Sequence, residues 1–404
     1  MENSDVNREI VPTSNAGVYQ DAEIVLTPWT ASGNFTNDKY KKLIEEFGVQ
    51  AITSDLLTRF EKLTGHQPHR LLRRGLFFAH RHFEEILDDF EQGKRIYIYT
   101  GRGPTSEALH LGHIIPMEFT VWLQQVFNAF VVFQMADDEK YWFKKVKFDH
   151  VYNLGFENAK DVIALGFNPD KTFIFSNRDY SRNESYQKVA FDIMKHAKMN
   201  DVRKIFGLDE SNCVGQMIWP IYQSTAAFSE AFEDIFGKAS QMRCLVAYAI
   251  DQDPYFRLAR DVAPKLNYKK PSSLMCRFLP ALGGDSKMSS TVDNTIFMND
   301  DTVTVKNKIK KYAFSGGQKT IELHRKLGAD VESDICIQWL RYFLESDKQL
   351  AELEKKYASG ELLTSEIKNV TSQIISDLLT LHQTKKKLVT PEIIKTFYDA
   401  SKKY

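Results

Sequence analysis

A strand, a glycine-rich turn and a helix follow one another between residues 95 and 123. Residues 95–100 (Arg-Ile-Tyr-Ile-Tyr-Thr) alternate in character and are rich in β-forming side chains. The segment 101–105 (Gly-Arg-Gly-Pro-Thr) ends the strand, and apolar residues at helical spacing begin at Ile114. Pro116 fits such a helix only near its start. This order predicts an α/β fold with a parallel sheet, in which ligands bind at the carboxyl ends of the strands.

His110 and His113, in the string His-Leu-Gly-His, fall at the junction between this strand and this helix. Unpaired backbone N–H groups and the helix dipole attract anions there. Gly112 would let a phosphate or a flat ring approach the backbone closely. Two imidazoles at this place can donate hydrogen bonds to phosphate oxygens as charge builds on them. The alternative is an unrelated pair of surface or core histidines.

A second string, Lys287-Met288-Ser289-Ser290, follows a glycine-rich stretch about 175 residues later. Lys287 offers a mobile ammonium group, and Ser289 and Ser290 offer hydroxyl donors, which together suit a pyrophosphate leaving group. Taken alone, this string could be an ordinary polar loop. The two strings in one chain predict the two halves of an ATP site.

The paired strings resemble the two ATP motifs of class I aminoacyl-tRNA synthetases. Longer blocks are similar to eukaryotic cytosolic tryptophanyl-tRNA synthetases, and the resemblance runs from about residue 22 to the C-terminus. The blocks are 27–30, 99–113, 134–141, 249–257 and 313–317. Two positions depart from the family pattern: Ala136 replaces a hydroxyl residue, and Ser290-Thr291 replaces the more usual Ala-Ser. Neither change removes a required donor, because Ser289 and Ser290 remain.

The resemblance implies an ATP-dependent ligase that joins L-tryptophan to tRNA(Trp). It implies Mg²⁺ with the ATP, a cytoplasmic homodimer, and one tRNA spanning two subunits. The implied catalytic residues are Lys287, His110, His113 and Arg102. The implied ATP-binding residues are Gly101, Arg102, Thr105, His110, Gly112, His113, Lys287, Met288, Ser289 and Ser290. The resemblance places Tyr99 and Gln134 at the indole ring, and Glu139, Gln223 and Gln252 around the ammonium and carboxylate groups of tryptophan.

The organisation predicts a Rossmann-like catalytic domain between two other regions. We expect a disordered tail over residues 1–20 and an N-terminal extension with helices packing on the catalytic domain over 21–93. Strand-like runs alternate with helical segments over 94–291, the catalytic domain. Residues 292–404 are charged and helical, and the resemblance makes them an anticodon-binding domain whose last helix (about 390–404) returns to the catalytic domain. The expected strands are 97–99, 130–135, 172–175 and 245–250.

Composition excludes several classes of protein. The formal net charge is zero, so a nucleic-acid partner needs local basic patches; candidates are 70–74, 306–311 and 385–387, although each could equally be a solvated helix face. The four cysteines are widely spaced without a Cys-x-x-Cys pair, which indicates a reducing compartment and no zinc. The polar N-terminus is unlike a secretory or transit peptide, and no run of 18 apolar residues predicts a membrane span.

Three alternatives stay open at this point. Small nucleotidylyltransferases share His-x-Gly-His, but they are usually shorter and leave Lys287 to Ser290 unexplained. Tyrosyl-tRNA synthetase shares the fold and is the nearest rival. A non-catalytic RNA-binding or signalling paralogue is a different class, although such proteins tend to lose the ATP motifs.

Replacing Lys287 with alanine should slow adenylate formation by about 10²- to 10³-fold, the effect of removing one donor aimed at developing charge. Tryptophan affinity should change little, because the ammonium group is directed at the leaving pyrophosphate. Single-turnover kinetics measure the two quantities separately. An unchanged rate would mean that the second string has no part in the chemistry.

Overall fold

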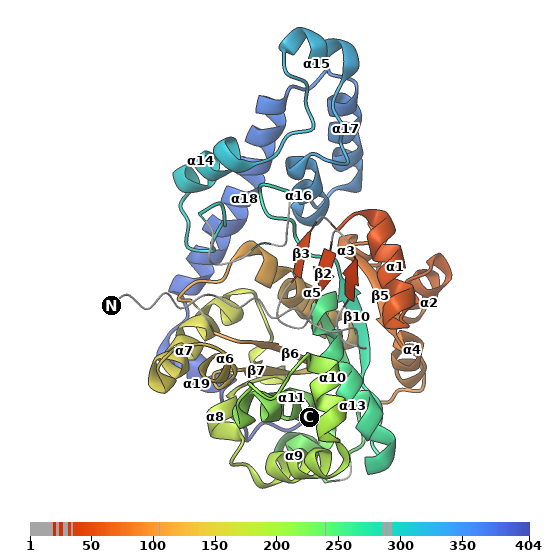
Figure 1. Ribbon diagram of the computed structural model, residues 1–404, viewed down its shortest axis with the longest axis vertical. Helices are drawn as coiled ribbons and strands as arrows, with labels where there is room; N and C mark the ends of the chain where they lie inside the picture. Colours follow the sequence, from red (N-terminus) through yellow and green to blue (C-terminus); the bar gives the residue numbers. More distant parts are fainter. Residues whose placement is uncertain are drawn as a thin grey trace.

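The computed structural model describes residues 19–21, 24–26, 31–33, 35–104, 106–238, 240–284, 288 and 293–404. Residues 1–18 of the expected tail and the block 27–30 lie outside this part of the chain. Residues 19 and 20 belong to β1, in a small antiparallel sheet of β1 (Tyr19–Asp21), β2 (Ile24–Leu26) and β3 (Ala31–Gly33). The main body is an α/β domain, and a helical region stands at one end of it (Figure 1).

The α/β domain is built on a seven-stranded sheet in the order β4-β5-β10-β9-β6-β7-β8. The parallel strands are β6 (Ile96–Arg102), β7 (Phe130–Met135), β8 (Thr172–Ser176), β9 (Arg243–Ala249) and β10 (Ser272–Cys276). The parallel sheet and the four expected strands are therefore confirmed. The sheet also includes β5 (Phe77–Arg81), which pairs antiparallel with β10, and the edge strand β4 (Gln50–Ala51), which pairs antiparallel with β5. Both lie before residue 94.

Each strand of the parallel sheet alternates its side chains between two buried faces. One face, which includes Ile98 and Val131, packs on the first of two helical layers. That layer is α2 (Ser54–Thr64), α4 (Phe83–Glu91), α5 (Leu111–Phe127) and α7 (Phe148–Ala164). The other face, which includes Tyr99 and Val132, packs on the second layer. That layer is α9 (Glu184–His196), α11 (Val214–Thr225) and α13 (Asp253–Leu266).

Short elements complete the α/β domain. They are α1 (Asn37–Phe47), α3 (Arg70–Arg73), α6 (Glu139–Phe143), η1 (Pro169–Lys171), α8 (Asn177–Tyr180), α10 (Met199–Phe206), η2 (Ser229–Phe232), α12 (Glu233–Phe236) and η3 (Ile250–Gln252). None of the helices in the described ranges is long and apolar enough to cross a membrane.

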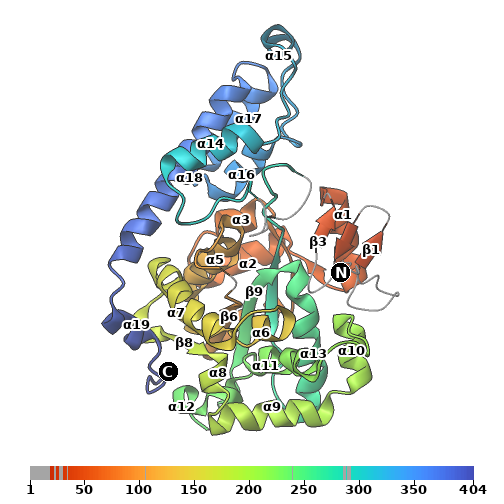
Figure 2. The same cartoon turned by 60° about the vertical axis from the view of Figure 1, so that its left-hand side comes forward.

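The helical region after residue 300 is held to the α/β domain by its longest helix. Its elements are α14 (Thr302–Tyr312), α15 (Ile321–Leu327), α16 (Ile335–Phe343), α17 (Asp347–Ala358), α18 (Thr364–Lys387) and α19 (Pro391–Phe397). The 24 residues of α18 span about 36 Å, from α14 and α16 down to α7 (Figure 2). There Asp161 of α7 accepts hydrogen bonds from His382 Nε2 and Lys386 Nζ, each at 2.9 Å. α19 then lies against α7, β8 and η1.

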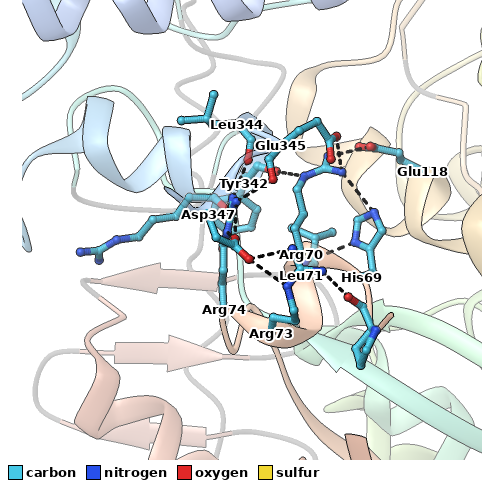
Figure 3. Close-up of polar contacts among 12 residues, drawn as sticks. His69, Arg70, Leu71, Arg73, Arg74, Glu118, Tyr342, Leu344, Glu345 and Asp347 are labelled. Carbon is cyan, nitrogen blue, oxygen red and sulfur yellow. Dashed lines mark hydrogen bonds and ion pairs between the residues drawn. The ribbon is translucent and has the colours of Figure 1, made fainter. Parts of the chain in front are cut away.

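A second junction between the two regions is formed by the arginines of the 70–74 cluster (Figure 3). The side chain of Arg70 is only 4% exposed. Its Nε donates to the carbonyl of Tyr342 at 2.8 Å, and its Nη2 donates to Glu118 of α5 at 2.7 Å. Its Nη1 lies 2.6 Å from Glu345. One guanidinium therefore joins α3, the helix that begins at the His-Leu-Gly-His string, and the end of α16.

Arg73 and Arg74 form hydrogen bonds and ion pairs in the same junction. Arg74 Nη1 donates to the carbonyls of Arg341 (2.9 Å) and Leu344 (2.7 Å), in the last turn of α16, where carbonyls have no partner within the helix. Both arginines also bind Asp347, at 2.9 and 2.7 Å. The cluster is therefore neither the solvated helix face nor the free nucleic-acid patch that the sequence suggested, because its donors satisfy the end of another helix.

Replacing Arg70 with methionine should lower the free energy of unfolding by about 2 kcal/mol, because the Tyr342 carbonyl and the Glu118 carboxylate lose a buried partner. Arg59 is the matched control: it pairs with Asp88 and Glu91 on the surface, so Arg59→Met should cost less than about 1 kcal/mol. Urea unfolding of both variants measures the difference. Equal losses would show that the Arg70 contacts add no more than a surface ion pair.

Candidate active site

The predicted site residues gather at the carboxyl ends of β6, β7 and β9. Gly101 of β6 lies directly beside Gln134 of β7 in the parallel register. Gln252 ends η3, the turn that follows β9. Tyr99 was expected at the end of its strand, but β6 continues to Arg102, because its polar last residues keep the ladder pairing with β7. Tyr99 and Gln134 belong to the alternating positions that face the second helical layer.

His110 and His113 meet at the start of α5, as the strand–turn–helix pattern predicted. His110 is the N-cap residue, and the two imidazoles stack with their centroids 3.4 Å apart. A Cβ on Gly112 would lie 3.1 Å from Cε1 of the His110 ring, so a larger residue would disturb this stack. Pro116 lies in the second turn of α5 and has no N–H, so the carbonyl of Gly112 lacks its usual helical donor.

The second string approaches the first at Met288. Met288 is 4% exposed, and its Cβ lies 3.7 Å from the position that a Cβ on Gly112 would occupy. The backbone N–H of Met288 donates to the carbonyl of Leu279 at 3.3 Å. Lys287, Ser289, Ser290 and Thr105 lie outside the described residues, so Met288 alone joins the two strings in space.

Arg102 holds His113 from the end of β6. Its Nη1 donates to His113 Nε2 at 2.7 Å, and its Nε donates to Asn158 of α7 at 3.4 Å. Burial lowers the pKa of Arg102 to about 10, against the opposing influence of Glu139 and Asp161. The guanidinium is therefore still charged at neutral pH and places a fixed positive charge beside the two imidazoles.

Gln134 lies at the centre of a buried polar network. Its Oε1 accepts from the Tyr99 hydroxyl at 2.5 Å. Its Nε2 donates to Asn177 Oδ1 at 2.8 Å and to the Tyr186 hydroxyl at 3.1 Å. Gln134 and Asn177 are each 1% exposed. Buried amides are favourable only when they are hydrogen-bonded, and here both ends of the Gln134 amide have partners.

The residues expected around the amino-acid head group lie near the same strand ends. Gln223 Nε2 of α11 donates to Gln252 Oε1 at 3.5 Å. Glu139 begins α6, directly after the turn that follows β7, and pairs with Lys140 at 2.8 Å. A Cβ on Gly103 would lie 2.2 Å from Glu139 Oε2, so this carboxylate approaches the glycine-rich turn closely.

Several residues of the candidate site were not identified from the sequence. Asp138, Asn177 and Tyr186 support Gln134, and Gly103 and Lys140 adjoin Glu139. Asp138 and Lys140 lie within block 134–141, and Gly103 lies within block 99–113. Both blocks carry the family resemblance, which could have indicated these residues as part of the candidate site. No local pattern marks Asn177 or Tyr186, which reach Gln134 from 43 and 52 residues away.

Two buried carboxylates follow β7. Burial raises the pKa of Asp138 to about 7, with a smaller contribution from the negative charge of Asp137. Asp138 Oδ2 accepts from Asn177 Nδ2 at 2.6 Å, whereas Asp137 accepts from Ser176 Oγ (2.5 Å) and from the backbone N–H of Arg178 (3.1 Å). The two neighbours therefore belong to different hydrogen-bond groups.

Within the described ranges, no group of three or more His, Cys, Asp or Glu side chains is arranged to hold a metal ion. Cys213 is exposed, and Cys244, Cys276 and Cys336 are separate buried thiols.

Comparisons with known proteins identify the family of this chain. The family model for tRNA synthetases class I (W and Y) matches residues 91–380. The cytoplasmic tryptophan–tRNA ligase of Homo sapiens is 45% identical over 392 residues, covering 96% of this chain and 83% of the relative. The crystal structure of Plasmodium falciparum tryptophanyl-tRNA synthetase superposes with a TM-score of 0.84 at 42% identity, covering 90% of this chain and 95% of that one.

A further solved structure is that of the tryptophanyl-tRNA synthetase of Encephalitozoon cuniculi bound to tryptophan. It has a TM-score of 0.81 and 35% identity, and covers 89% of this chain and 99% of its own. The fold, the two ATP strings and these comparisons agree along most of the chain. The chain belongs to the class I tRNA synthetases of the tryptophanyl and tyrosyl type, and the relatives described above, which match 89–96% of it, are tryptophan–tRNA ligases or tryptophanyl-tRNA synthetases.

Proposed function

We propose that this protein activates L-tryptophan with ATP and transfers it to the 3′ end of tRNA(Trp). The observation that carries the proposal is the buried pair of Tyr99 and Gln134 beside the ATP strings. Tryptophan is distinguished by a large flat ring with one N–H donor, so its site needs apolar walls and one well-placed acceptor. A site that satisfies this N–H rejects analogues that lack it, because its own polar group is then left unpaired.

The Tyr99–Gln134 pair suits a neutral N–H donor. The single proton of the Tyr99 hydroxyl is committed to Gln134 Oε1. The phenol oxygen and the second lone pair of Oε1 are then both acceptors. An uncharged acceptor pair is suited to an uncharged donor, because no ionised group has to be desolvated.

The head group of tryptophan is assigned to the rim of the same pocket. The carboxylate of Glu139 supplies a counter-charge for the ammonium group. The Oε1 atoms of Gln223 and Gln252 supply further acceptors, and their Nε2 groups can bind the carboxylate. This assignment directs the carboxylate toward the start of α5, where His110 and His113 would bind ATP.

In the proposed reaction, a carboxylate oxygen of tryptophan attacks the α-phosphorus of ATP in line. The bond from that phosphorus to the bridging oxygen breaks, pyrophosphate leaves, and tryptophanyl-adenylate remains. The 3′-terminal ribose hydroxyl of the tRNA then attacks the activated carbonyl, loses its proton, and AMP leaves. Such transfers depend mainly on positioning and charge stabilisation. Arg102 contributes by holding His113, and Lys287 is assigned to the leaving pyrophosphate.

Other parts of the proposal concern partners. ATP is assigned to Gly101, Arg102, Thr105, His110, Gly112, His113 and Met288, together with Lys287, Ser289 and Ser290. Mg²⁺ accompanies the phosphates of ATP, and no step is assigned to a protein-bound metal. The helical region from α14 to α18 reads the anticodon, two copies of the chain form a dimer, and one tRNA spans both. The curated relatives are named as cytoplasmic proteins, and we propose the same location here.

Among the twenty amino acids, tryptophan alone should support ATP–pyrophosphate exchange above background, because the pocket offers acceptors to a ring N–H. The assay follows labelled pyrophosphate into ATP with each amino acid in turn. Exchange driven by tyrosine would contradict the pocket assignment and make the chain a tyrosyl enzyme. Exchange with no amino acid would favour the non-catalytic alternative.

Replacing Gln134 with alanine should weaken tryptophan binding about 10- to 100-fold, because the indole N–H would be buried without this acceptor, at a cost of roughly 1–3 kcal/mol. ATP affinity should hardly change. An isostere with sulfur in place of the indole N–H should bind the variant about as well as the wild type. Calorimetric titration of each ligand measures these affinities.

Gln124 provides a matched control for this substitution. It is also a buried glutamine (3% exposed), but it binds Thr172 and the carbonyl of Lys171 at the opposite end of the sheet from Gln134. Gln124→Ala should therefore leave tryptophan affinity unchanged. If Gln134→Ala weakens tryptophan and the isostere equally, Gln134 is structural and the recognition role belongs to Tyr99 or another residue.

A further inference from the structure

A glutamine acceptor works only when its amide group lies the right way round. The two ends of a glutamine amide have nearly the same shape but opposite hydrogen-bonding roles. With Oε1 toward Tyr99, the pocket presents acceptors to an indole N–H. With Nε2 toward Tyr99, the phenol oxygen would accept from the amide, and the proton of the Tyr99 hydroxyl would point into the pocket. The hydroxyl donor would then face the indole N–H, which is also a donor. Something besides shape must therefore fix the orientation of Gln134.

The hydrogen bonds behind Gln134 lead to a carboxylate, which can only accept when it is ionised. Asn177 Oδ1 accepts from Gln134 Nε2, and Asn177 Nδ2 donates to Asp138 Oδ2 at 2.6 Å. An ionised carboxylate has no donor, so Asn177 must turn its NH₂ group toward Asp138 and its oxygen toward Gln134. Gln134 must in turn direct its own NH₂ group toward Asn177. The donors and acceptors along the hydrogen-bonded series Asp138–Asn177–Gln134–Tyr99 can thus be arranged in only one order.

We propose that Asn177 and Asp138 are positioning residues that fix the orientation of the Gln134 amide, and so make the pocket select a ring N–H. The proposal rests on the tryptophan pocket proposed above. Neither residue touches the indole in this scheme: Asp138 sets the direction of Asn177, and Asn177 sets that of Gln134.

The surroundings of the amide favour the same direction, but less strongly. The backbone carbonyl of Tyr222 lies 3.5 Å from Gln134 Nε2, so a reversed amide would bring two oxygens together. The hydroxyl of Tyr186 contacts Nε2 at 3.1 Å and donates to the Tyr222 carbonyl at 2.9 Å. While its single proton is donated to the Tyr222 carbonyl or to Asn177 Oδ1 (3.0 Å), the hydroxyl oxygen accepts from Nε2. The proton can rotate toward a reversed amide, however, so the hydroxyl fixes the orientation less firmly than an acceptor without a proton does. Asn177, at 2.8 Å, is the shortest partner of Nε2 and the one whose role the carboxylate dictates.

The test compares tryptophan with its sulfur isostere in pyrophosphate exchange at pH 8, above the pKa of about 7 that burial gives Asp138. The wild type should favour tryptophan by about 10- to 100-fold in kcat/KM, the size of one buried hydrogen bond. Asn177→Leu should reduce this preference by about 3- to 10-fold, mainly through tryptophan. A purely structural role would lower both substrates together and leave the ratio unchanged.

A second pair of variants tests the anchor and remains decisive if Asn177→Leu fails to fold. Asp138→Leu should reduce the preference, because Asn177 loses the acceptor that directs it. Asp138→Asn should retain the preference, because the new amide can still present an oxygen to Asn177. Asp137→Asn is the matched control: it neutralises the neighbouring buried carboxylate, whose partners are Ser176 and Arg178, and should leave the ratio unchanged.

The outcomes separate the two proposals. A wild type that exchanges tryptophan but shows no preference over the isostere overturns the pocket and this inference together. A wild-type preference that survives in both Asn177→Leu and Asp138→Leu overturns only the positioning role. Loss of the preference in Asp137→Asn as well would also overturn it, because general damage at the end of β7 would then explain the effect.

Discussion

The candidate active site depends on the convergence of parallel strands at one edge of a sheet. Because β6, β7 and β9 run in the same direction, their carboxyl ends bring Tyr99, Gln134 and the turn carrying Gln252 together. Because side chains alternate between the two faces of a strand, residues of this edge point toward different helical layers. Tyr99 and Gln134 face the second helical layer, whereas the His-Leu-Gly-His string begins a helix of the first layer. The strand edge thus lies between the proposed amino-acid pocket and the proposed nucleotide site.

The local features of this arrangement were predictable from the sequence, and the long-range ones were not. Residues 130–135 are apolar except for Gln134, so β7 was predicted with its correct bounds. The strand–turn–helix order placed His110 and His113 correctly at the start of α5. By contrast, β4 has only two residues, too few for a readable period, and the antiparallel position of β5 between β4 and β10 is set by long-range pairing that no local pattern shows. Asn177 was missed because its role exists only once β7 and β8 pair.

The arginines of α3 show why charge in a sequence does not reveal its use. Residues 70–74 contain three arginines, and the sequence allowed a solvated face or a nucleic-acid contact. The fold instead places Arg70 and Arg74 against the last turn of α16, where unpaired carbonyls need donors, and pairs Arg73 with Asp347. Helix ends are obligatory acceptor sites, but which donors reach them is decided by tertiary packing. Tertiary packing also decides the partner of Lys386, another residue of the basic candidates, which pairs with Asp161 of α7.

The placing of charge around Gln134 follows from the cost of burial. A carboxylate in direct contact with the indole would have to be desolvated, and its charge would have no counter-charge in a neutral N–H. In this structure the carboxylate of Asp138 is two hydrogen bonds away from where the indole would lie against Gln134, behind Asn177, and burial raises its pKa to about 7. Neutral amides transmit the direction of the hydrogen bonds inward without carrying a net charge. In the proposed pocket, an ionised Asp138 can therefore determine which end of the Gln134 amide faces the ligand without contacting the ligand itself, because each amide has one donor end and one acceptor end.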